Sequence, residues 1–141
     1  MTEKLIGQVA IVTGGNSGIG EATAHLFAAE GGHVILLARR EQEGHDVEEA
    51  IKSYGGDSLF IRCDVSERKQ VDEAVRKIMS QFGRIDVLFN NAGGGDLGNF
   101  PDESDESWDR VLSVNLTGTF HMCRAVWDHM VAGGGGKIVN M

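Results

Sequence analysis

Proline and cysteine are nearly absent from the 141-residue sequence, which contains one Pro and two Cys. The two cysteines, Cys63 and Cys123, lack the spacing of a zinc knuckle or a redox pair, so we expect reduced thiols in a reducing compartment. The five histidines show no HExxH or comparable ligand pattern. We therefore expect no metal site.

A long hydrophobic run and an excess of positive charge are also missing. The apolar stretch from Leu5 to Val12 is interrupted by Gly7 and Gln8, and is too short and too polar for a signal peptide or membrane span. The formal net charge is -8, whereas nucleic acids and anionic membrane surfaces attract clustered Lys and Arg. We expect a cytoplasmic protein with neither a nucleic acid nor a membrane as partner.

Short apolar runs alternate along the chain with segments of helical periodicity. The runs predict five strands, and because they are apolar throughout, both faces of their sheet should be covered: Val9–Val12, Val34–Leu37, Leu59–Ile61, Ile85–Phe89 and a strand that opens with Ile138-Val139. Strand–helix–strand alternation predicts a parallel sheet with helices on both sides. The fold class is therefore a doubly wound α/β (Rossmann) sheet, within one domain over residues 1–141.

The helical segments between these runs are predicted from their spacing and end signals. In the first, Ile19, Leu26 and Phe27 recur at helical spacing. Ser66 is the expected N-cap of the third. After an acidic, glycine-rich loop over about 93–105, the pattern predicts two helices broken near 115–118. Their tryptophans, Trp108 and Trp127, are expected in the core or at an interface.

The first strand runs directly into a glycine cluster, Thr13-Gly14-Gly15-Asn16-Ser17-Gly18-Ile19-Gly20, and then into a helix. Glycines there let the backbone turn sharply, approach a pyrophosphate closely and pack the helix against the sheet. The helix N-terminus offers free N–H groups to the phosphates. This context predicts a dinucleotide-binding loop, with a glycine-rich turn that binds nothing as the alternative. The predicted cofactor residues in this loop are Gly14, Asn16, Ser17, Gly18, Ile19 and Gly20.

The glycines at 14, 18 and 20 form a TGxxxGxG pattern, and with it the chain resembles the short-chain dehydrogenase/reductase family. Three further segments agree over essentially the whole chain: Asp64-Val65, where the family contacts adenine, Asn90-Asn91-Ala92-Gly93, which matches its NNAG segment, and Val114-Asn115, which matches its helix asparagine. The resemblance, to the N-terminal half of the family, implies strand order 3-2-1-4-5. It also implies cofactor contacts from Asp64, Val65, Asn91, Ala92 and Gly93, and a proton relay supported by Asn115.

Each of these segments also has an ordinary structural interpretation. Asp64 could cap the helix that follows it. Asn90 and Asn91 could form a turn, since Asn tolerates left-handed geometry. Asn115 could mark a helix break without any catalytic role.

The end of the second strand approaches the adenosine ribose in a dinucleotide fold, and an acidic residue there favours NAD. In this sequence the position is Ala38, followed by Arg39 and Arg40. Because arginine forms paired, charge-assisted hydrogen bonds with phosphate, these two residues favour NADP. Solvated arginines are the alternative, and Glu41 and Glu43, read as first-turn helix residues, would favour NAD if they were displaced to the strand end.

The resemblance also implies a catalytic Ser and a YxxxK pair after the fifth strand. The single tyrosine, Tyr54, is followed four residues later by Ser58, so it is not that pair. We predict that the chain alone is inactive. Two functions stay open. The chain is the NADP(H)-binding part of an enzyme that interconverts an alcohol and a carbonyl and binds its substrate only in a full-length form, or it is a non-enzymatic nucleotide-binding or interaction protein.

An exposed fifth strand predicts a homo-oligomer. An acidic stretch over 102–109 is expected to be a solvated loop and helix start.

Overall fold

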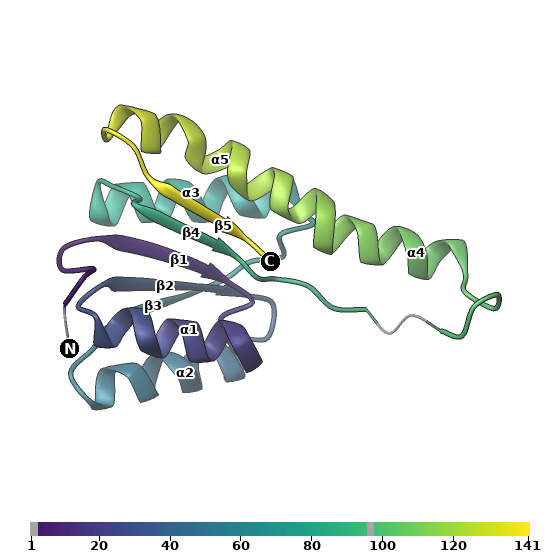
Figure 1. Ribbon diagram of the computed structural model, residues 1–141, viewed down its shortest axis with the longest axis horizontal. Helices are drawn as coiled ribbons and strands as arrows, with labels where there is room; N and C mark the ends of the chain where they lie inside the picture. Colours follow the sequence, from purple (N-terminus) through teal and green to yellow (C-terminus); the bar gives the residue numbers. More distant parts are fainter. Residues whose placement is uncertain (1–2, 96–97) are drawn as a thin grey trace.

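The computed structural model describes residues 3–95 and 98–141 of the chain (Figure 1). The elements alternate as predicted: β1 (Val9–Thr13), α1 (Gly18–Ala29), β2 (His33–Ala38), α2 (Glu41–Ser53), β3 (Asp57–Arg62), α3 (Arg68–Phe82), β4 (Val87–Asn90), α4 (Asp105–Leu112), the π-helical segment η1 (Ser113–Thr117), α5 (Gly118–Ala132) and β5 (Lys137–Asn140). All strand pairs are parallel and the order is β3-β2-β1-β4-β5. The predicted fold class and strand order are confirmed.

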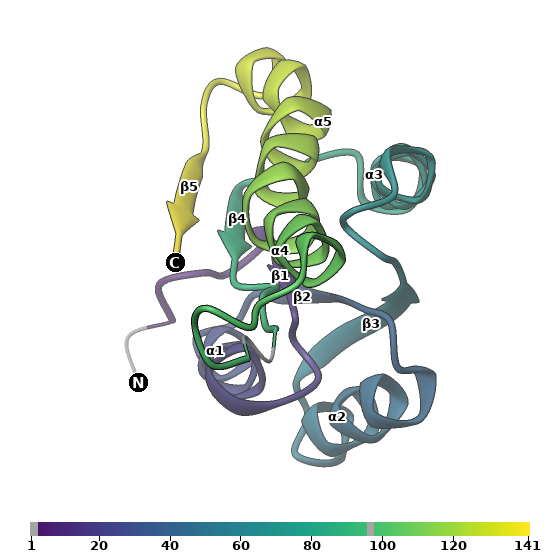
Figure 2. The same ribbon diagram turned by 90° about the vertical axis from the view of Figure 1, so that its right-hand side faces the viewer.

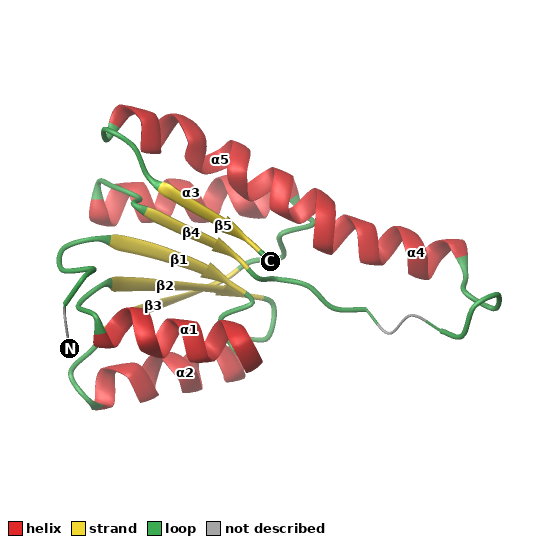
Figure 3. Ribbon diagram, in the orientation of Figure 1, coloured by secondary structure: helices red, strands yellow, loops and turns green. Residues whose placement is uncertain are grey.

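Helices cover the two faces of the sheet in separate layers, with α1 and α2 on one face and α3 and α5 on the other (Figures 2 and 3). Alternate strand residues enter opposite cores: Ile11 and Leu37 pack in the α3–α5 layer, whereas Val12 and Leu36 pack in the α1–α2 layer. All four are fully buried. This burial on both faces explains why the strands are apolar throughout.

The buried face of α1 is not the one that its large apolar residues indicated. Ile19 and Leu26 are 56% and 58% exposed. The buried residues of α1 are instead Gly20, Ala24 and Ala28. Of the predicted stripe, Phe27 packs against the α1–α2 core, but Ile19 and Leu26 were wrong, because small residues occupy the buried face where the helix lies close to the sheet.

The N-cap of α3 differs from the prediction by one residue. It is Glu67, and helical geometry begins at Arg68. Ser66 instead donates from its backbone N and from Oγ to Asp64 Oδ1, at 3.0 and 2.7 Å. Ser66 is therefore held in an Asx turn before the helix rather than at its cap.

The expected break near 115–118 is also wrong, since α4, η1 and α5 form one continuous helical rod. Backbone geometry stays helical through Leu112, Thr117 and Gly118, and the irregularity is a π-helical segment rather than an interruption. Such segments insert an extra residue into a helix without ending it. The amino-terminal part of the rod, α4, projects beyond the sheet and buries none of its residues (Figure 1).

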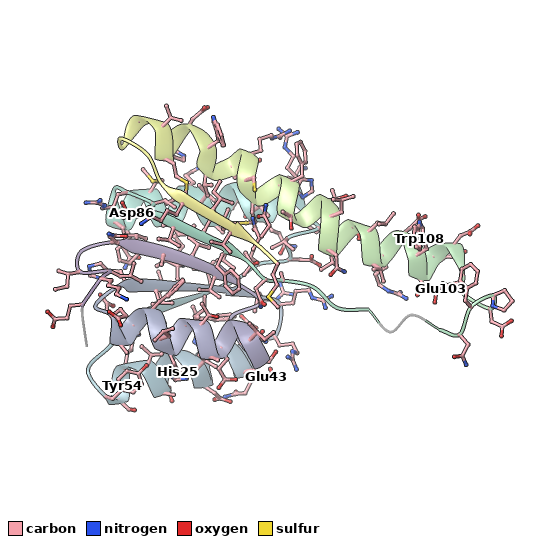
Figure 4. All side chains as sticks on the ribbon, in the orientation of Figure 1. His25, Glu43, Tyr54, Asp86, Glu103 and Trp108 are labelled. Atoms are coloured by element: carbon pink, nitrogen blue, oxygen red, sulfur yellow. The ribbon has the colours of Figure 1, made fainter. Side chains whose placement is uncertain are left out.

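Both tryptophans lie on the surface of this rod rather than in the core. Trp108 and Trp127 are 53% and 60% exposed, and Trp108 is on the projecting arm (Figure 4). Of the acidic stretch, Asp105 and Glu106 form the first turn of α4 as expected. Positions 96–97 of the predicted glycine-rich loop lie outside the described residues.

The fifth strand is an edge of the sheet, as predicted from the strand order. It pairs only with β4 among the described strands, and Val139 is 51% exposed. Cys63 is buried and Cys123 is half-buried, and neither forms a disulfide. No helix within residues 3–95 and 98–141 is long and apolar enough to cross a membrane.

Candidate functional site: a groove at the carboxyl ends of the strands

A groove opens where β1, β2, β3 and β4 end, at the edge toward which the strands point in Figure 1. Strand order reverses between β1 and β4, and parallel sheets of this type bind ligands at that reversal. The groove is lined by the last two residues of β2, by residues from the loops after all four strands and by one residue of η1: Gly14, Asn16, Ser17, Leu37, Ala38, Arg39, Arg40, Cys63, Asp64, Val65, Asn91, Ala92, Gly93 and Val114.

The glycine loop forms the wall of the groove between β1 and α1. Gly14 has a φ of +64°, and a Cβ atom there would lie 3.0 Å from Cα of Ala92. Its N–H donates to Leu37 O at 2.8 Å. Ser17 occupies the N-cap position of α1 but makes no side-chain cap hydrogen bond, so its hydroxyl does not occupy the N–H groups of the first turn. A phosphate fits this helix start.

Thr13 fixes the loop after β4 to the end of β1. Its Oγ1 accepts hydrogen bonds from the backbone N of Asn91 at 3.0 Å and of Ala92 at 2.9 Å. In return, Asn91 Nδ2 donates to the carbonyl oxygens of Thr13 and Gly14, at 3.2 and 3.3 Å. Thr13 is only 1% exposed. These four bonds hold the two loops at a fixed separation and give Asn91 a role beyond turn formation.

The two arginines after β2 have different surroundings. Arg40 Nη1 donates to Glu43 Oε1 at 3.1 Å, and Arg40 Nη2 lies 3.5 Å from Ser17 Oγ, a long hydrogen bond. No hydrogen bond or ion pair is found for Arg39 in the described part of the chain. Glu41 and Glu43 lie in the first turn of α2, as predicted, and not at the strand end.

Asp64 both lines the groove and closes the turn before α3. Its carboxylate accepts from Ser66, and its backbone N donates to Gln70 Oε1 at 2.9 Å. The adjacent Val65 is 5% exposed, and its carbonyl oxygen shares a hydrogen bond with His121 Nδ1 at 2.9 Å. Asp64 is not the cap of α3, since the N-cap is Glu67, and the Asp64 carboxylate instead shapes the turn that brings this residue to the groove.

Asn115 lies beside the groove in η1 and is bound to the loop after β4. Its Nδ2 donates to Gly94 O at 2.8 Å and to Val111 O at 2.9 Å, and its Oδ1 accepts from Gly94 N at 3.3 Å. The neighbouring Val114 lines the groove, whereas Asn115 does not. The side chain of Asn115 thus positions the Gly93–Gly95 loop.

Most of the residues predicted to bind a cofactor line this one groove. They are Gly14, Asn16, Ser17, Arg39, Arg40, Asp64, Val65, Asn91, Ala92 and Gly93. Gly18, Ile19 and Gly20 do not line it: Gly20 packs against Gly14, and Ile19 is exposed. Sequence reasoning did not propose Leu37, Cys63 or Val114 as lining residues. The carboxyl end of each strand was the signal for Leu37 and Cys63, since such ends meet at one edge.

Tyr54 is remote from the groove. It lies at the opposite end of the α1–α2 layer from Glu43 (Figure 4) and shares a hydrogen bond with His25 Nδ1 at 2.9 Å. Burial raises the pKa of Tyr54 above its ordinary value. Both its place and its ionisation disfavour an acid–base role at the groove.

Comparison with known proteins agrees with this geometry. The family model of short chain dehydrogenases matches residues 8–141. An uncharacterized oxidoreductase of Thermotoga maritima is 39% identical over 96% of this chain, which covers 53% of that protein. The chain spans about half the length of the curated relatives it matches.

Two solved structures have nearly the same fold. A metagenomic short-chain oxidoreductase in complex with NADP has a TM-score of 0.92 and 36% identity over 96% of this chain and 62% of its own. A xylitol dehydrogenase bound to NAD+ has a TM-score of 0.92 and 36% identity over 97% of this chain and 53% of its own. The chain belongs to the short-chain dehydrogenase family of oxidoreductases.

Proposed function

We propose that this chain is the NADP(H)-binding part of a short-chain dehydrogenase that interconverts an alcohol and a carbonyl by hydride transfer. The observation that carries the proposal is the groove at the strand ends, with a helix N-terminus on one side and two arginines at the end of β2. Arginine binds phosphate through paired, charge-assisted hydrogen bonds, and among the described residues no acidic side chain lines the β2 end of the groove. These features favour a 2′-phosphate over a free 2′-hydroxyl.

Within this proposal each loop has one task. The glycine loop from Gly14 to Gly20 binds the pyrophosphate, while Arg39 and Arg40 bind the 2′-phosphate. Asp64 and Val65 contact the adenine, and the 91–93 loop supports the ribose and nicotinamide. When bound, the cofactor supplies the hydride-transfer chemistry, and Asn115 supports proton movement by holding its loop in place.

We further propose that these 141 residues bind the cofactor without turning over substrate. The chain contains no YxxxK pair, and its one tyrosine lies away from the groove. A carbonyl or alcohol substrate belongs to a full-length form of the enzyme in this proposal, whereas the exposed β5 edge favours self-association of the chain itself. The NADP-bound neighbour is consistent with the cofactor choice, and the NAD+-bound one identifies the competing cofactor.

Calorimetric titration with NADPH and with NADH tests the cofactor proposal directly. We expect NADPH to bind more tightly, and Arg39→Met to weaken NADPH by about tenfold, the effect of losing one charged hydrogen-bonding partner, with NADH unchanged. Arg76→Met, which removes the same charge from α3 outside the groove, is the matched control. Equal binding of both cofactors, or equal effects of the two substitutions, would refute the assignment of Arg39.

A further inference from the structure

The contact between Arg40 and Glu43 is the one ion pair at the mouth of the groove among the described residues. Arg40 Nη1 and Glu43 Oε1 are 3.1 Å apart, and the two side chains are 59% and 44% exposed. Glu43 lies at the end of the α1–α2 layer nearest the carboxyl ends of the strands (Figure 4). Its position in the first turn of α2 is stabilised by the helix dipole independently of Arg40.

Arg39 and Glu41 are neighbours of this pair in the sequence, but neither forms an ion pair among the described residues. Arg39 lines the groove without an ion pair in the described part of the chain, so its guanidinium retains all its donors for a ligand. Glu41 occupies the same first turn as Glu43 and makes no ion pair there either. The chain thus contains one paired and one unpaired arginine, and one paired and one unpaired glutamate, within five consecutive residues.

A carboxylate bound to Arg40 opposes a phosphate in two ways. It occupies a guanidinium nitrogen that a phosphate would otherwise use, and it places a negative charge beside the position where a phosphate dianion would bind. Like charges this close repel, and the repulsion is reduced by solvent at an exposed site but not removed. A ligand that ends in a ribose hydroxyl experiences neither effect.

We propose that Glu43 is a specificity-determining residue that limits the preference of the groove for a 2′-phosphate. This inference rests on the proposed function, because it assumes that the adenosine end of a nicotinamide dinucleotide lies at Arg39 and Arg40. Arg39 binds the phosphate, whereas Arg40 is partly neutralised by Glu43. The consequence is a site that prefers NADP but keeps NAD as a competing ligand.

Two adenosine fragments test the proposal on the 141-residue chain without any catalytic readout. The probes are 2′,5′-ADP, which contains the 2′-phosphate, and 5′-AMP, which lacks it, each titrated by calorimetry at low salt. The variants are Glu43→Gln, its matched control Glu41→Gln, Arg40→Met, and the double variant Arg40→Met/Glu43→Gln. Arg40 and Glu41 are exposed and Glu43 is partly exposed, and a thermal melt of every variant checks that the fold is retained.

We expect Glu43→Gln to tighten 2′,5′-ADP by about threefold to fivefold, the range that an exposed charge pair contributes. The affinity for 5′-AMP should stay the same, and Glu41→Gln should change either affinity by less than about twofold, since it removes an unpaired charge. In the Arg40→Met background, the gain in affinity for 2′,5′-ADP that Glu43→Gln produces should fall by more than half. Raising the salt concentration should shrink the gain in the wild-type background.

The contrary outcomes distinguish a failure of the role of Glu43 from a failure of the proposed function. Wild-type binding of 2′,5′-ADP with no gain in Glu43→Gln, or with an equal gain in Glu41→Gln, overturns the role of Glu43 and leaves the proposed function intact. A gain that persists fully without Arg40 overturns the proposed coupling. No binding of either probe by any variant overturns the proposed function and this inference together.

Discussion

Replacing Thr13 by valine removes the oxygen that joins the β1 and β4 loops while keeping the shape of the side chain. Thr13 Oγ1 accepts from two backbone N–H groups, those of Asn91 and Ala92, and is almost completely buried. Thr13→Val leaves both donors without that partner. An unpaired buried donor costs about 1–3 kcal/mol. Because Asn91 and Ala92 are only partly buried, we take the lower part of this range, about 1–1.5 kcal/mol, for each donor. For the two donors together we expect a loss of about 2–3 kcal/mol in the free energy of unfolding.

The matched control is Thr13→Ser, which keeps the accepting oxygen and loses one methyl group. Removing that methyl from a buried position costs about 1 kcal/mol. Urea unfolding monitored by far-UV circular dichroism compares the two variants with the wild type. The midpoint should fall clearly further for Thr13→Val than for Thr13→Ser, with similar slopes. Equal midpoints for the two variants would show that the Thr13 hydroxyl does not hold the loop and would refute the reasoning.

Three further predictions concern the carboxylate of Asp86 before β4, the close packing of Gly20 and the thiol of Cys63. Burial raises the pKa of Asp86, but hydrogen bonds from Arg84 and the Val9 N–H outweigh it and leave the pKa lowered. A lowered pKa stabilises the fold above the ordinary carboxyl pKa, and this stability is lost as the pH falls through the folded-state value. Asp86→Asn should therefore cost about 1–2 kcal/mol near neutral pH, and in urea titrations its deficit should shrink below about pH 4. Gly20→Ala would drive a Cβ into Gly14 O and Asn91 Nδ2, so it should lower the melting temperature and weaken NADPH and NADH alike. Gly18 has a φ of +54° and no neighbour within 4 Å, so Gly18→Ala strains the backbone without a clash and should leave cofactor affinity higher than in Gly20→Ala. Equal affinities would contradict the packing argument. Burial, reinforced by Asp64, raises the pKa of Cys63 to about 12, so iodoacetamide followed by peptide mass spectrometry should modify Cys63 only in denaturant, and rapid modification of the folded chain would contradict this.

The strands and the groove were predictable because buried parallel strands and glycine loops have local signatures. Apolar runs such as Val34–Leu37 appear in the sequence without reference to any partner. Once the alternation fixed a parallel sheet, the carboxyl ends of its strands had to meet at one edge. Arg39 was found in this way from the end of the second strand, whereas Asp64 was proposed from the resemblance to the family, and both line the groove.

What the sequence could not predict depends on contacts between distant segments. Periodicity identified Ile19 and Leu26 as the apolar face of α1, but the sheet is contacted by Gly20, Ala24 and Ala28, which have little hydrophobic signal. The role of Thr13 depends on residues 78 and 79 positions away.

The helical rod was mispredicted for a related reason. Asn115 has a polar side chain, which suggested a helix break, but its hydrogen bonds to Gly94 and Val111 stabilise the rod and the loop instead. Helix breaks and π-helical segments look alike in sequence because both replace regular i→i−4 bonds with others. Only the position of the 93–95 loop distinguishes them.

The residues that line the groove and the exposed apolar residues of the α4–α5 rod are different sets, and this difference has a consequence for assembly. Every groove residue but Val114 comes from the β1 to β4 half of the chain. The exposed large side chains of the rod, including Phe120, Trp127 and Val131, point away from the core that contains Met122 and Val126. An interface formed on that exposed surface, or along the β5 edge, would bury apolar area without touching the residues that we propose to bind the phosphates. We therefore expect the 141-residue chain to self-associate in light scattering, with an affinity for NADPH that does not change with protein concentration. A concentration-dependent affinity would mean that η1, through Val114 and Asn115, couples the rod to the groove.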